Sequence, residues 1–340
     1  MLLACENPDK IARMFAIAEE IKQAFYGNRI VLFAPLYLSN YCINGCVYCP
    51  YHGQNKHIPR KKLTQADVIA LQDMGHKRLV IETGEDLVNN LLDYIPDCIH
   101  TIYSIKHKNG AIRRVNVNIA TTTVEDYRKL KAAGIGTYIL FQEIYHKDSY
   151  EKLHPTGLKH NYAWYTEAMD SAMEGGIDDV GLGVFFDLEG YKYEFAGLLM
   201  HAEHLEVVHG VGPHTISVPR GKKADDIAPE AFDNSISDEF FTKIAACIRL
   251  AVPYTGMIIS IRESEMVREK CCRWVFRRSA ELAVPVWEAI RKRSGLRSRS
   301  SSMCLTKEPW MRLSSGSWRR SIFRLSVRPA IGKGVSVIGL

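Results

Sequence analysis

Short apolar runs rich in β-branched residues alternate with amphipathic segments along residues 1–270. The apolar runs are typical of strands and lie at residues 30–38, 78–82, 113–119, 137–141, 179–186, 214–218 and 257–261. Between them, apolar positions recur every three to four residues, as in helices, most clearly at 89–106, 123–133, 161–174, 190–207 and 237–251. Strands that alternate with helices predict an α/β fold with a parallel sheet. We therefore expect a partial TIM-type (β/α) barrel with about seven of the eight βα units.

Polar side chains cluster directly after these predicted strands. In a barrel of this class the carboxyl ends of all strands meet at one mouth, where active sites are built. We therefore expect the clusters to line a single site. They are Cys42 to Cys49 after the first strand, Glu82 to Asp86 after the second, Gln142 and Glu143 after the fourth, Arg220 after the sixth, and Arg262 and Glu263 after the seventh.

The formal net charge of +6 comes entirely from the end of the chain. Residues 271–340 contain 15 Lys and Arg against three Glu, so residues 1–270 are net negative. This distribution argues against a nucleic-acid partner for the main body of the protein. No run of eighteen apolar residues occurs, so no membrane span is expected. Nine cysteines, most of them scattered, and no recognisable secretory leader indicate a reducing cytoplasm.

The basic tail differs in kind from the rest of the chain. It holds twelve Arg, twelve Ser and four of the five Trp, yet no Asp, Asn, His, Tyr or Gln. Neither a helical nor a strand period persists across it. We interpret it as an out-of-frame reading after Lys270, because codons can be chosen so that the neighbouring frame encodes a strand-like segment and a Cys-x2-Cys pair. An arginine-rich arm that binds nucleic acid is the alternative.

This interpretation divides the chain into three parts. We expect a helical segment over residues 1–29, the barrel over 30–270, and an irregular, poorly folded tail over 271–340. A barrel without its eighth strand would have a gap between the seventh strand and the first, with unpaired backbone groups at both edges. Such a product is expected to be unstable.

Cys42, Cys46 and Cys49 form the most informative motif, Cys-x3-Cys-x2-Cys. Three thiolates can hold a [4Fe-4S] cluster whose fourth iron has no protein ligand, and such an iron can bind a substrate or cofactor. Structural zinc is the alternative, but it usually has four protein ligands. His52 or His57 would have to supply the fourth, and neither lies at a usual spacing.

Further stretches carry a family resemblance. They include Glu82-Thr83-Gly84-Glu85-Asp86, Leu153-His154-Pro155-Thr156-Gly157, Met200-His201-Ala202-Glu203-His204-Leu205 and Tyr254-Thr255-Gly256-Met257. Together with the cysteine motif they resemble the radical S-adenosylmethionine (SAM) tyrosine lyases, and within these the HydG family of [FeFe]-hydrogenase maturases. The resemblance covers the chain from about residue 1 to Lys270.

The resemblance implies a radical SAM barrel, a [4Fe-4S] cluster and SAM as cofactors, and a radical carbon-carbon lyase activity. SAM would be cleaved to a 5′-deoxyadenosyl radical, which would split L-tyrosine into p-cresol and dehydroglycine. In the maturases a second cluster in a C-terminal domain helps to convert dehydroglycine into CO and cyanide for the hydrogenase H-cluster. That region is not recognisable here, so we expect this copy to be inactive in the full synthesis.

The partners implied are L-tyrosine, a reductant such as flavodoxin or ferredoxin, and other hydrogenase maturation proteins. Two alternatives stay open. One is a 2-iminoacetate synthase of thiamine thiazole synthesis, and the other is a non-catalytic iron-sulfur protein.

Roles for single residues follow from the resemblance and from their chemistry, with a structural or surface role as the alternative for each residue outside the cysteine motif. Cys42, Cys46 and Cys49 would bind the cluster, with Tyr48 as the aromatic residue before the last cysteine. Glu85 would accept the SAM amino group, and Asn118 and Glu143 would hold its carboxylate or ribose. Arg262, with Ser260 beside it, would bind the tyrosine carboxylate, and His204 would handle the amine or phenol proton.

Overall fold

The computed structural model describes most of the first 280 residues. The described ranges are 2–29, 31–71, 77–107, 110–222, 224–228, 232–260, 262–274 and 278–280. Most of the basic tail, and with it our interpretation of an out-of-frame reading, lies outside these residues.

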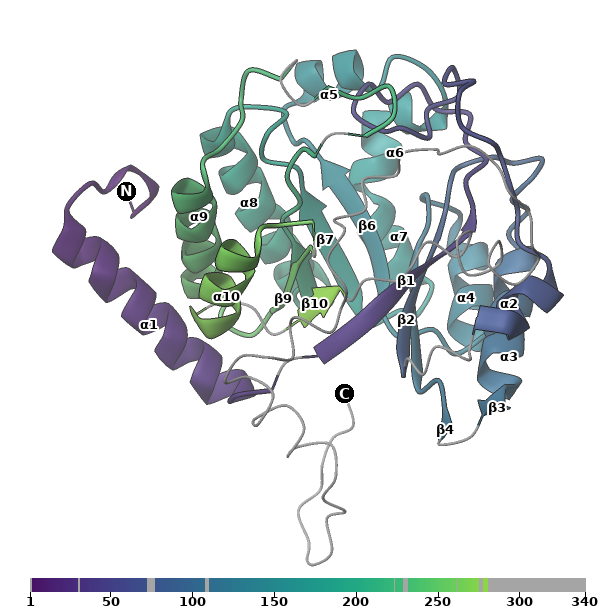
Figure 1. Ribbon diagram of the computed structural model, residues 1–340, viewed down its shortest axis with the longest axis horizontal. Coiled ribbons are helices and arrows are strands. Elements are labelled where there is room, and N and C mark those ends of the chain that lie inside the picture. Colours follow the sequence, from purple (N-terminus) through teal and green to yellow (C-terminus); the bar gives the residue numbers. More distant parts are fainter. Residues whose placement is uncertain are drawn as a thin grey trace, which may run out of the picture. The chain divides into compact units, whose positions relative to one another are not determined.

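Eight parallel strands of the described chain form a closed barrel (Figure 1). Their order around the barrel is β1-β10-β9-β8-β7-β6-β5-β2. The strands are β1 (Val31–Ser39), β2 (Arg78–Thr83), β5 (Arg114–Asn118), β6 (Tyr138–Glu143), β7 (Val180–Val184), β8 (Thr215–Ser217), β9 (Gly256–Ile259) and β10 (Arg278–Ala280). A small antiparallel pair, β3 (Lys106–His107) and β4 (Gly110–Ala111), lies apart from the barrel.

The seven strands expected before residue 270 are confirmed, but the expected gap is not. β10 lies between β9 and β1, with Val31 opposite Arg278 and Ser279 opposite Ile259. Its three residues belong to the segment that we expected to be irregular. Backbone pairing depends little on side-chain type, so even a short segment of unusual composition can pair with both open edges.

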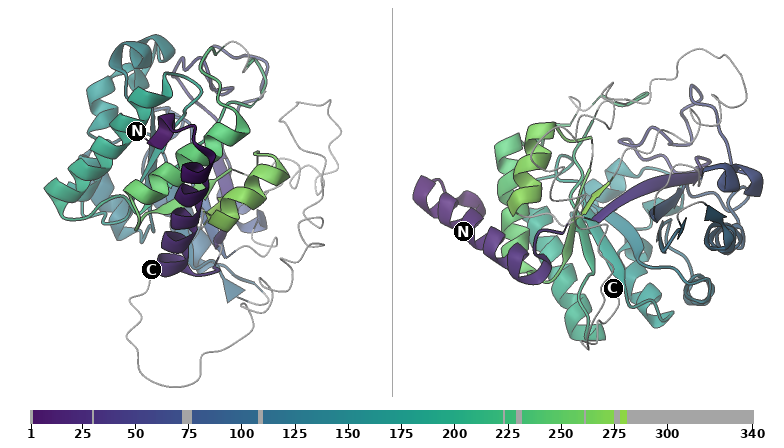
Figure 2. Two further views of the ribbon diagram at one scale, coloured as in Figure 1. Left: turned by 90° about the vertical axis from the view of Figure 1, so that its left-hand side faces the viewer. Right: turned by 60° about the horizontal axis from the view of Figure 1, so that its bottom comes forward.

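Helices cover the outside of the barrel (Figures 1 and 2). They are α1 (Pro8–Tyr26), α2 (Gln65–Leu71), α3 (Tyr94–Ser104), α4 (Val124–Ala132), α5 (Lys147–Leu153), α6 (Tyr162–Thr166), α7 (Ala168–Glu174), α8 (Tyr191–His209), α9 (Asp238–Ala251) and α10 (Glu265–Trp274), with short 3-10 turns η1 (Leu2–Ala4) and η3 (Leu158–His160). The five clearest predicted helices are all found, although the one expected at 161–174 is divided into α6 and α7. No helix in the described ranges is both long and apolar enough to span a membrane.

Local sequence signals start several of these helices. Asn7, Thr123 and Ser237 precede α1, α4 and α9, and each side chain accepts a hydrogen bond from a backbone N–H of the first turn. Helix α10 continues past Lys270, and its Cys271 side chain is buried in the main core. The chain therefore shows no structural break at residue 270.

Two apolar layers hold the barrel together. The larger core joins the strands to the helices. A smaller cluster consists of Phe33, Val80 and Ile139, packed with Phe141 and Ile258. All five side chains come from strands and none from a helix, so we assign this cluster to the barrel interior. The interior is thus filled, which leaves the carboxyl ends of the strands as the place for a binding site.

Candidate active site at the carboxyl ends of the strands

The three motif cysteines lie on one loop that follows β1. Cys46 is buried, and Cys42 and Cys49 are partly buried. The loop turns where Cys49 N–H donates to the Cys46 carbonyl at 3.2 Å. It lies so close to Gly84, at the end of β2, that a Cβ atom there would be 2.2 Å from the Tyr41 carbonyl oxygen and 2.9 Å from Cys42 Cβ. Glycine at position 84 therefore allows the loop to rest on the strand end.

The electrostatics of this loop fit a bound cationic centre. Burial, with a smaller contribution from a neighbouring thiol in each case, raises the pKa of Cys46 to about 11 and that of Cys49 to about 12. The Cys46 and Cys49 thiols are therefore protonated at neutral pH unless a positive centre stabilises their thiolates, which is what iron ions do. The thiol set thus suits an iron-sulfur cluster.

The zinc alternative finds no support in this geometry. Within the described ranges, no three His, Cys, Asp or Glu side chains converge on a position that could hold one metal ion. A four-iron cluster bonds each thiolate to a different iron, so its cysteines need not converge. His52 and His57, the possible fourth ligands, instead lie beside Asp226 (3.1 Å) and Asp225 (4.0 Å).

Glu85 is a buried link between the cysteine loop and the helical layer. Its carboxylate oxygen Oε2 accepts hydrogen bonds from Asn44 Nδ2 at 2.5 Å and from the Tyr165 hydroxyl at 2.7 Å. Its backbone carbonyl accepts from Ile43 N–H at 2.9 Å. The alternative of an ordinary surface acid is thereby excluded, because Glu85 is only 8% exposed.

Asn118 and Glu143 end neighbouring strands, as the sequence indicated. Asn118 is partly buried at the end of β5, and no hydrogen bond of its side chain occurs within the described residues. Glu143 is 8% exposed and follows an irregularity in the β6–β7 pairing between Phe141 and Glu143. Its φ of 66° lies in the left-handed region, which is strained for a residue other than glycine. Such local strain is typical of functional sites.

The Glu143 carboxylate is only partly satisfied. Its Oε1 atom lies 3.3 Å from the ammonium group of Lys159. Its Oε2 atom is buried and has no hydrogen-bond partner among the described residues. Burial raises the pKa of Glu143, and the charge of Lys159 opposes that rise. A buried carboxylate oxygen without a donor indicates room for a donor group of a ligand.

Tyr48 is held by a buried histidine. Its hydroxyl lies 2.7 Å from Nε2 of His154, whose Nδ1 lies 2.7 Å from the Tyr150 carbonyl. A carbonyl can only accept, so Nδ1 carries the proton and Nε2 accepts from the Tyr48 hydroxyl. Burial lowers the pKa of His154 to about 3, which keeps its ring neutral. The Tyr48 ring also packs against Phe185, with ring centroids 5.7 Å apart.

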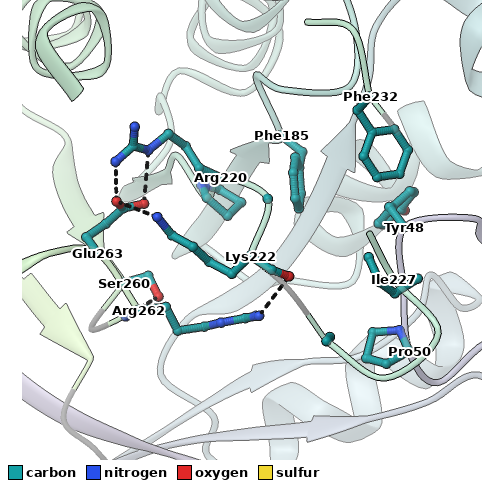
Figure 3. A pocket seen from close by; sticks show the side chains of 13 residues that line it. Tyr48, Pro50, Phe185, Arg220, Lys222, Ile227, Phe232, Ser260, Arg262 and Glu263 are labelled. Carbon is teal, nitrogen blue, oxygen red and sulfur yellow. Dashed lines mark hydrogen bonds and ion pairs between the residues drawn. The ribbon is translucent and has the colours of Figure 1, made fainter. Parts of the chain in front are cut away.

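Tyr48 and Phe185 form one wall of a cavity at the barrel mouth, and Ser260 and Arg262 lie across it (Figure 3). The cavity measures about 80 Å³, which is room for roughly six water molecules. Arg262 is exposed, and among the described residues its guanidinium makes only a long contact of 3.5 Å to the Lys222 carbonyl. Ser260 Oγ accepts from Arg262 N–H at 3.1 Å. Arg262 thus offers a free planar donor to an anion in this cavity.

A buried ion pair supports the Arg262 side of the cavity. The Arg220 guanidinium makes two hydrogen bonds to the Glu263 carboxylate, and these side chains are 6% and 1% exposed. Lys222 Nζ lies 3.2 Å from the same carboxylate, and Asp238 lies 2.8 Å from Arg220. The ion pair links the ends of β8 and β9 to the start of α9.

His204 does not lie with the other candidate residues. It is on α8, where its Nε2 lies 2.8 Å from Asp170 Oδ1 on α7, and its side chain is 48% exposed. Helices of a βα barrel run antiparallel to the strands, so the C-terminal half of α8 lies near the end opposite the mouth. The structure therefore does not bring His204 together with the other candidate residues, and its catalytic role stays a prediction.

Sequence reasoning missed Asn44, His154, Lys159 and Tyr165 as partners of the site residues. Each contacts a predicted site residue across 41 to 106 positions of sequence, except Lys159, which is 16 positions from Glu143. The Leu153–Gly157 stretch that carried the resemblance pointed to the neighbourhood of Lys159. It gave no sign that the lysine side chain is partly buried and paired with Glu143.

Known proteins share this sequence pattern and this fold. Residues 36–192 match the family model of the radical SAM superfamily. A crystal structure of HydG, a maturase of the [FeFe]-hydrogenase, is 53% identical with a TM-score of 0.83, covering 86% of this chain and 65% of that protein. HydG from Carboxydothermus hydrogenoformans is 35% identical with a TM-score of 0.82, covering 96% of this chain and 73% of that protein.

A 2-iminoacetate synthase from Escherichia coli (strain K12) is 28% identical over 74% of this chain and 66% of its own length. The chain thus spans slightly less than two thirds of this synthase and of the first of the two HydG structures.

Proposed function

The chain belongs to the HydG family of the radical SAM superfamily, and from that premise we propose that it cleaves L-tyrosine to p-cresol and dehydroglycine. One observation carries the proposal. The three-cysteine loop and the anion-accepting Arg262 face the same barrel mouth, with Tyr48 belonging to both the loop and the cavity wall. An electron source and an amino-acid carboxylate would thereby be held close together.

The cofactor side of the mouth has the donors and acceptors that SAM requires. Cys42, Cys46 and Cys49 would hold the cluster, which together with SAM supplies an electron and a carbon-centred radical when bound. Glu85 and the unpartnered Glu143 Oε2 are acceptors for an ammonium or ribose hydroxyl. Asn118 offers both an amide donor and an acceptor at the adjacent strand end.

The substrate side would orient tyrosine by its charged groups. Arg262 can bind a carboxylate through two parallel N–H donors. Ser260 fixes the backbone at Arg262, and the Arg220–Glu263 pair fixes the segment that follows. Phe185 and Tyr48 give the cavity an aromatic wall that suits a phenol ring. Because His204 lies elsewhere, no histidine is proposed for proton transfer.

A reducing protein such as flavodoxin or ferredoxin would supply the electron, and other hydrogenase maturation proteins would act downstream. The proposal ends at p-cresol and dehydroglycine and does not extend to CO and cyanide. The 2-iminoacetate synthase alternative shares the cleavage step, since dehydroglycine and 2-iminoacetate are the same compound. Its sequence identity of 28%, against 53% and 35% for the two HydG proteins, favours the HydG family.

The test is anaerobic iron-sulfur reconstitution of the full chain, followed by chromatography of the products formed from SAM, L-tyrosine and dithionite. We expect 5′-deoxyadenosine and p-cresol in equal amounts. 5′-Deoxyadenosine without p-cresol would refute the lyase assignment. Absence of both products from a chain that retains its cluster would favour the non-catalytic iron-sulfur protein.

A further inference from the structure

Residues 153–160 run from the last residue of α5 onward, and the cysteine loop packs against them. Val47 N–H donates to the Leu153 carbonyl at 3.1 Å, and Gly45 N–H donates to the Thr156 carbonyl at 3.0 Å. The contact is close, because a Cβ atom on Gly45 would lie 2.4 Å from the Thr156 hydroxyl oxygen. The position of residues 153–160 relative to the three cysteines is therefore fixed by backbone contacts on both sides.

Asn44 connects the cysteine loop to Lys159 as well. The Asn44 Oδ1 atom accepts from Lys159 N–H at 3.0 Å, while its Nδ2 donates to Glu85 at 2.5 Å. Gly157, with φ of +93°, passes so close that a Cβ atom would lie 2.2 Å from Asn44 Oδ1. The backbone of Lys159 is thus tied directly to a residue between Cys42 and Cys46.

The charged end of the Lys159 side chain lies beside Glu143 and the cysteine loop. Its ammonium lies 3.3 Å from Glu143 Oε1, and the two side chains are 13% and 11% exposed. The same nitrogen lies 5.8 Å from the ring centroid of Tyr48 and 5.2 Å from that of Tyr165. Tyr48 directly precedes Cys49, so the Lys159 ammonium lies beside the cysteine loop.

The Lys159–Glu143 ion pair is not expected to stabilise the fold. Removing two charges from water costs several kcal/mol each, and the loss is offset only when the remaining hydrogen-bonding positions are filled. Here Glu143 Oε2 is buried without a partner, and the Glu143 backbone is strained. A buried, incompletely satisfied pair beside clustered thiols indicates a functional role.

The effect of the charge on the loop has a definite sign. The Lys159 ammonium lies beside Tyr48, the residue before Cys49, and its positive charge favours negative charge on the neighbouring cysteine sulfur atoms. Reduction of a cluster bound to them adds one more negative charge at the same place. A fixed, largely shielded cation stabilises that electron by the same Coulomb attraction, which is weakly screened away from water.

We propose that Lys159 is a positioning residue that raises the reduction potential of the cluster held by Cys42, Cys46 and Cys49, and that Glu143 partly cancels its effect. The proposal rests on the proposed function only in assuming that the cluster binds. It requires neither SAM nor tyrosine. It can therefore be tested independently of the lyase proposal, because the reduction potential of the cluster can be measured without either compound.

The test is a redox titration of the reconstituted full chain, followed by electron paramagnetic resonance (EPR) in the absence of SAM, with iron and sulfide determined on every sample. Lys159→Met should shift the midpoint potential to a more negative value, and Lys159→Arg should keep it near that of the wild type. Glu143→Gln should shift it in the positive direction. Lys147→Met is the matched control, because Lys147 is an exposed lysine on α5, and it should leave the potential unchanged.

An unchanged potential in Lys159→Met, measured at full iron content, would overturn the proposal. If Lys159→Met fails to bind the cluster, Glu143→Gln decides the question. A positive shift in that variant supports the proposal, and no shift overturns it. A chain that shows the expected shifts but forms no p-cresol would refute the lyase assignment and leave the role of Lys159 standing.

Discussion

The two sides of the barrel mouth are built differently. On the cysteine side, Glu85 and Glu143 are buried, Lys159 is partly buried, and all three are tied by hydrogen bonds to the loop or to one another. On the opposite side, Arg262 is exposed and its guanidinium makes one long contact within the described part of the chain, although a buried ion pair lies next to it. The difference suggests that a permanent group is bound on the first side, and a group that enters and leaves on every turnover on the second.

Among the substitutions that test this difference, loss of a cysteine should have the largest effect on iron content and activity. Cys46→Ala removes the most deeply buried of the three ligands. We expect iron content to fall and product formation to drop below detection, because two thiolates cannot hold the cluster in place. Iron and sulfide analysis with EPR checks this. Cys247→Ala, which changes a buried cysteine on α9, should keep full iron content.

Loss of the arginine should act on the other side only. Arg262→Ala removes a charge-assisted carboxylate contact worth about 2–3 kcal/mol, so we expect KM for tyrosine to rise roughly 30- to 150-fold. Iron content and the cluster spectrum should not change. Arg128→Ala, at an exposed arginine of α4, is the control. A loss of cluster in Arg262→Ala would contradict the separation of the two sides.

Glu85→Gln tests the cofactor side by separating SAM binding from cluster binding. The amide keeps the size of the side chain but removes its charge, so we expect about tenfold weaker SAM binding at unchanged iron content. Equilibrium dialysis with labelled SAM measures this. If SAM binds equally well, Glu85 serves only to hold Asn44 and Tyr165.

The buried histidine makes the cysteine side sensitive to acid. The pKa of His154 is lowered from 6.5 to about 3 by burial, so between these values the unfolded chain binds a proton that the folded chain does not. The free energy of unfolding should therefore fall as the pH falls from 6.5 towards 3, by at most about 1.4 kcal/mol per pH unit.

Urea denaturation at pH 7 and pH 5 measures this loss. His154→Gln should be less stable than the wild type at pH 7 but lose less stability on acidification. It should keep the part due to His201, whose pKa burial lowers to about 4. An equal loss in both proteins would contradict the assignment of His154 as a neutral group.

The smallest effect is expected at His204. Because it contacts Asp170 on the outer helices, His204→Ala should change the rate of p-cresol formation by less than about twofold and stability by about 1 kcal/mol or less. A loss of activity with normal folding would instead support the catalytic role that the resemblance implies for His204. Steady-state kinetics together with thermal unfolding separates the two cases.

The sequence predicted the framework of the fold well because the signals are local. Strands β1 to β9 of the barrel are apolar runs with clear helical segments between them, and the polar groups after them do meet at the mouth. Strand β10 could not be predicted, since three residues in a segment without periodicity carry no local signal. The same composition led us to expect a gap that the structure closes.

The hydrogen-bond partners of the site residues could not be predicted from the sequence alone. Contacts such as Asn44 to Glu85 join residues 41 positions apart, and the strained backbone of Glu143 depends on an irregular pairing with β7. His204 lies in the C-terminal half of α8, away from the other candidate residues, and the sequence motif carries no sign of this position. Motif matching identifies a neighbourhood, whereas helix geometry decides which side chains reach the mouth.

EPR of the reduced, reconstituted chain with and without SAM would test whether three cysteines leave one iron open at the barrel mouth. We expect the spectrum of the cluster to change when SAM is added, because the cofactor binds the iron that lacks a cysteine. An identical spectrum in both samples, from a chain with four irons per molecule, would contradict the cluster assignment and the lyase function proposed from it.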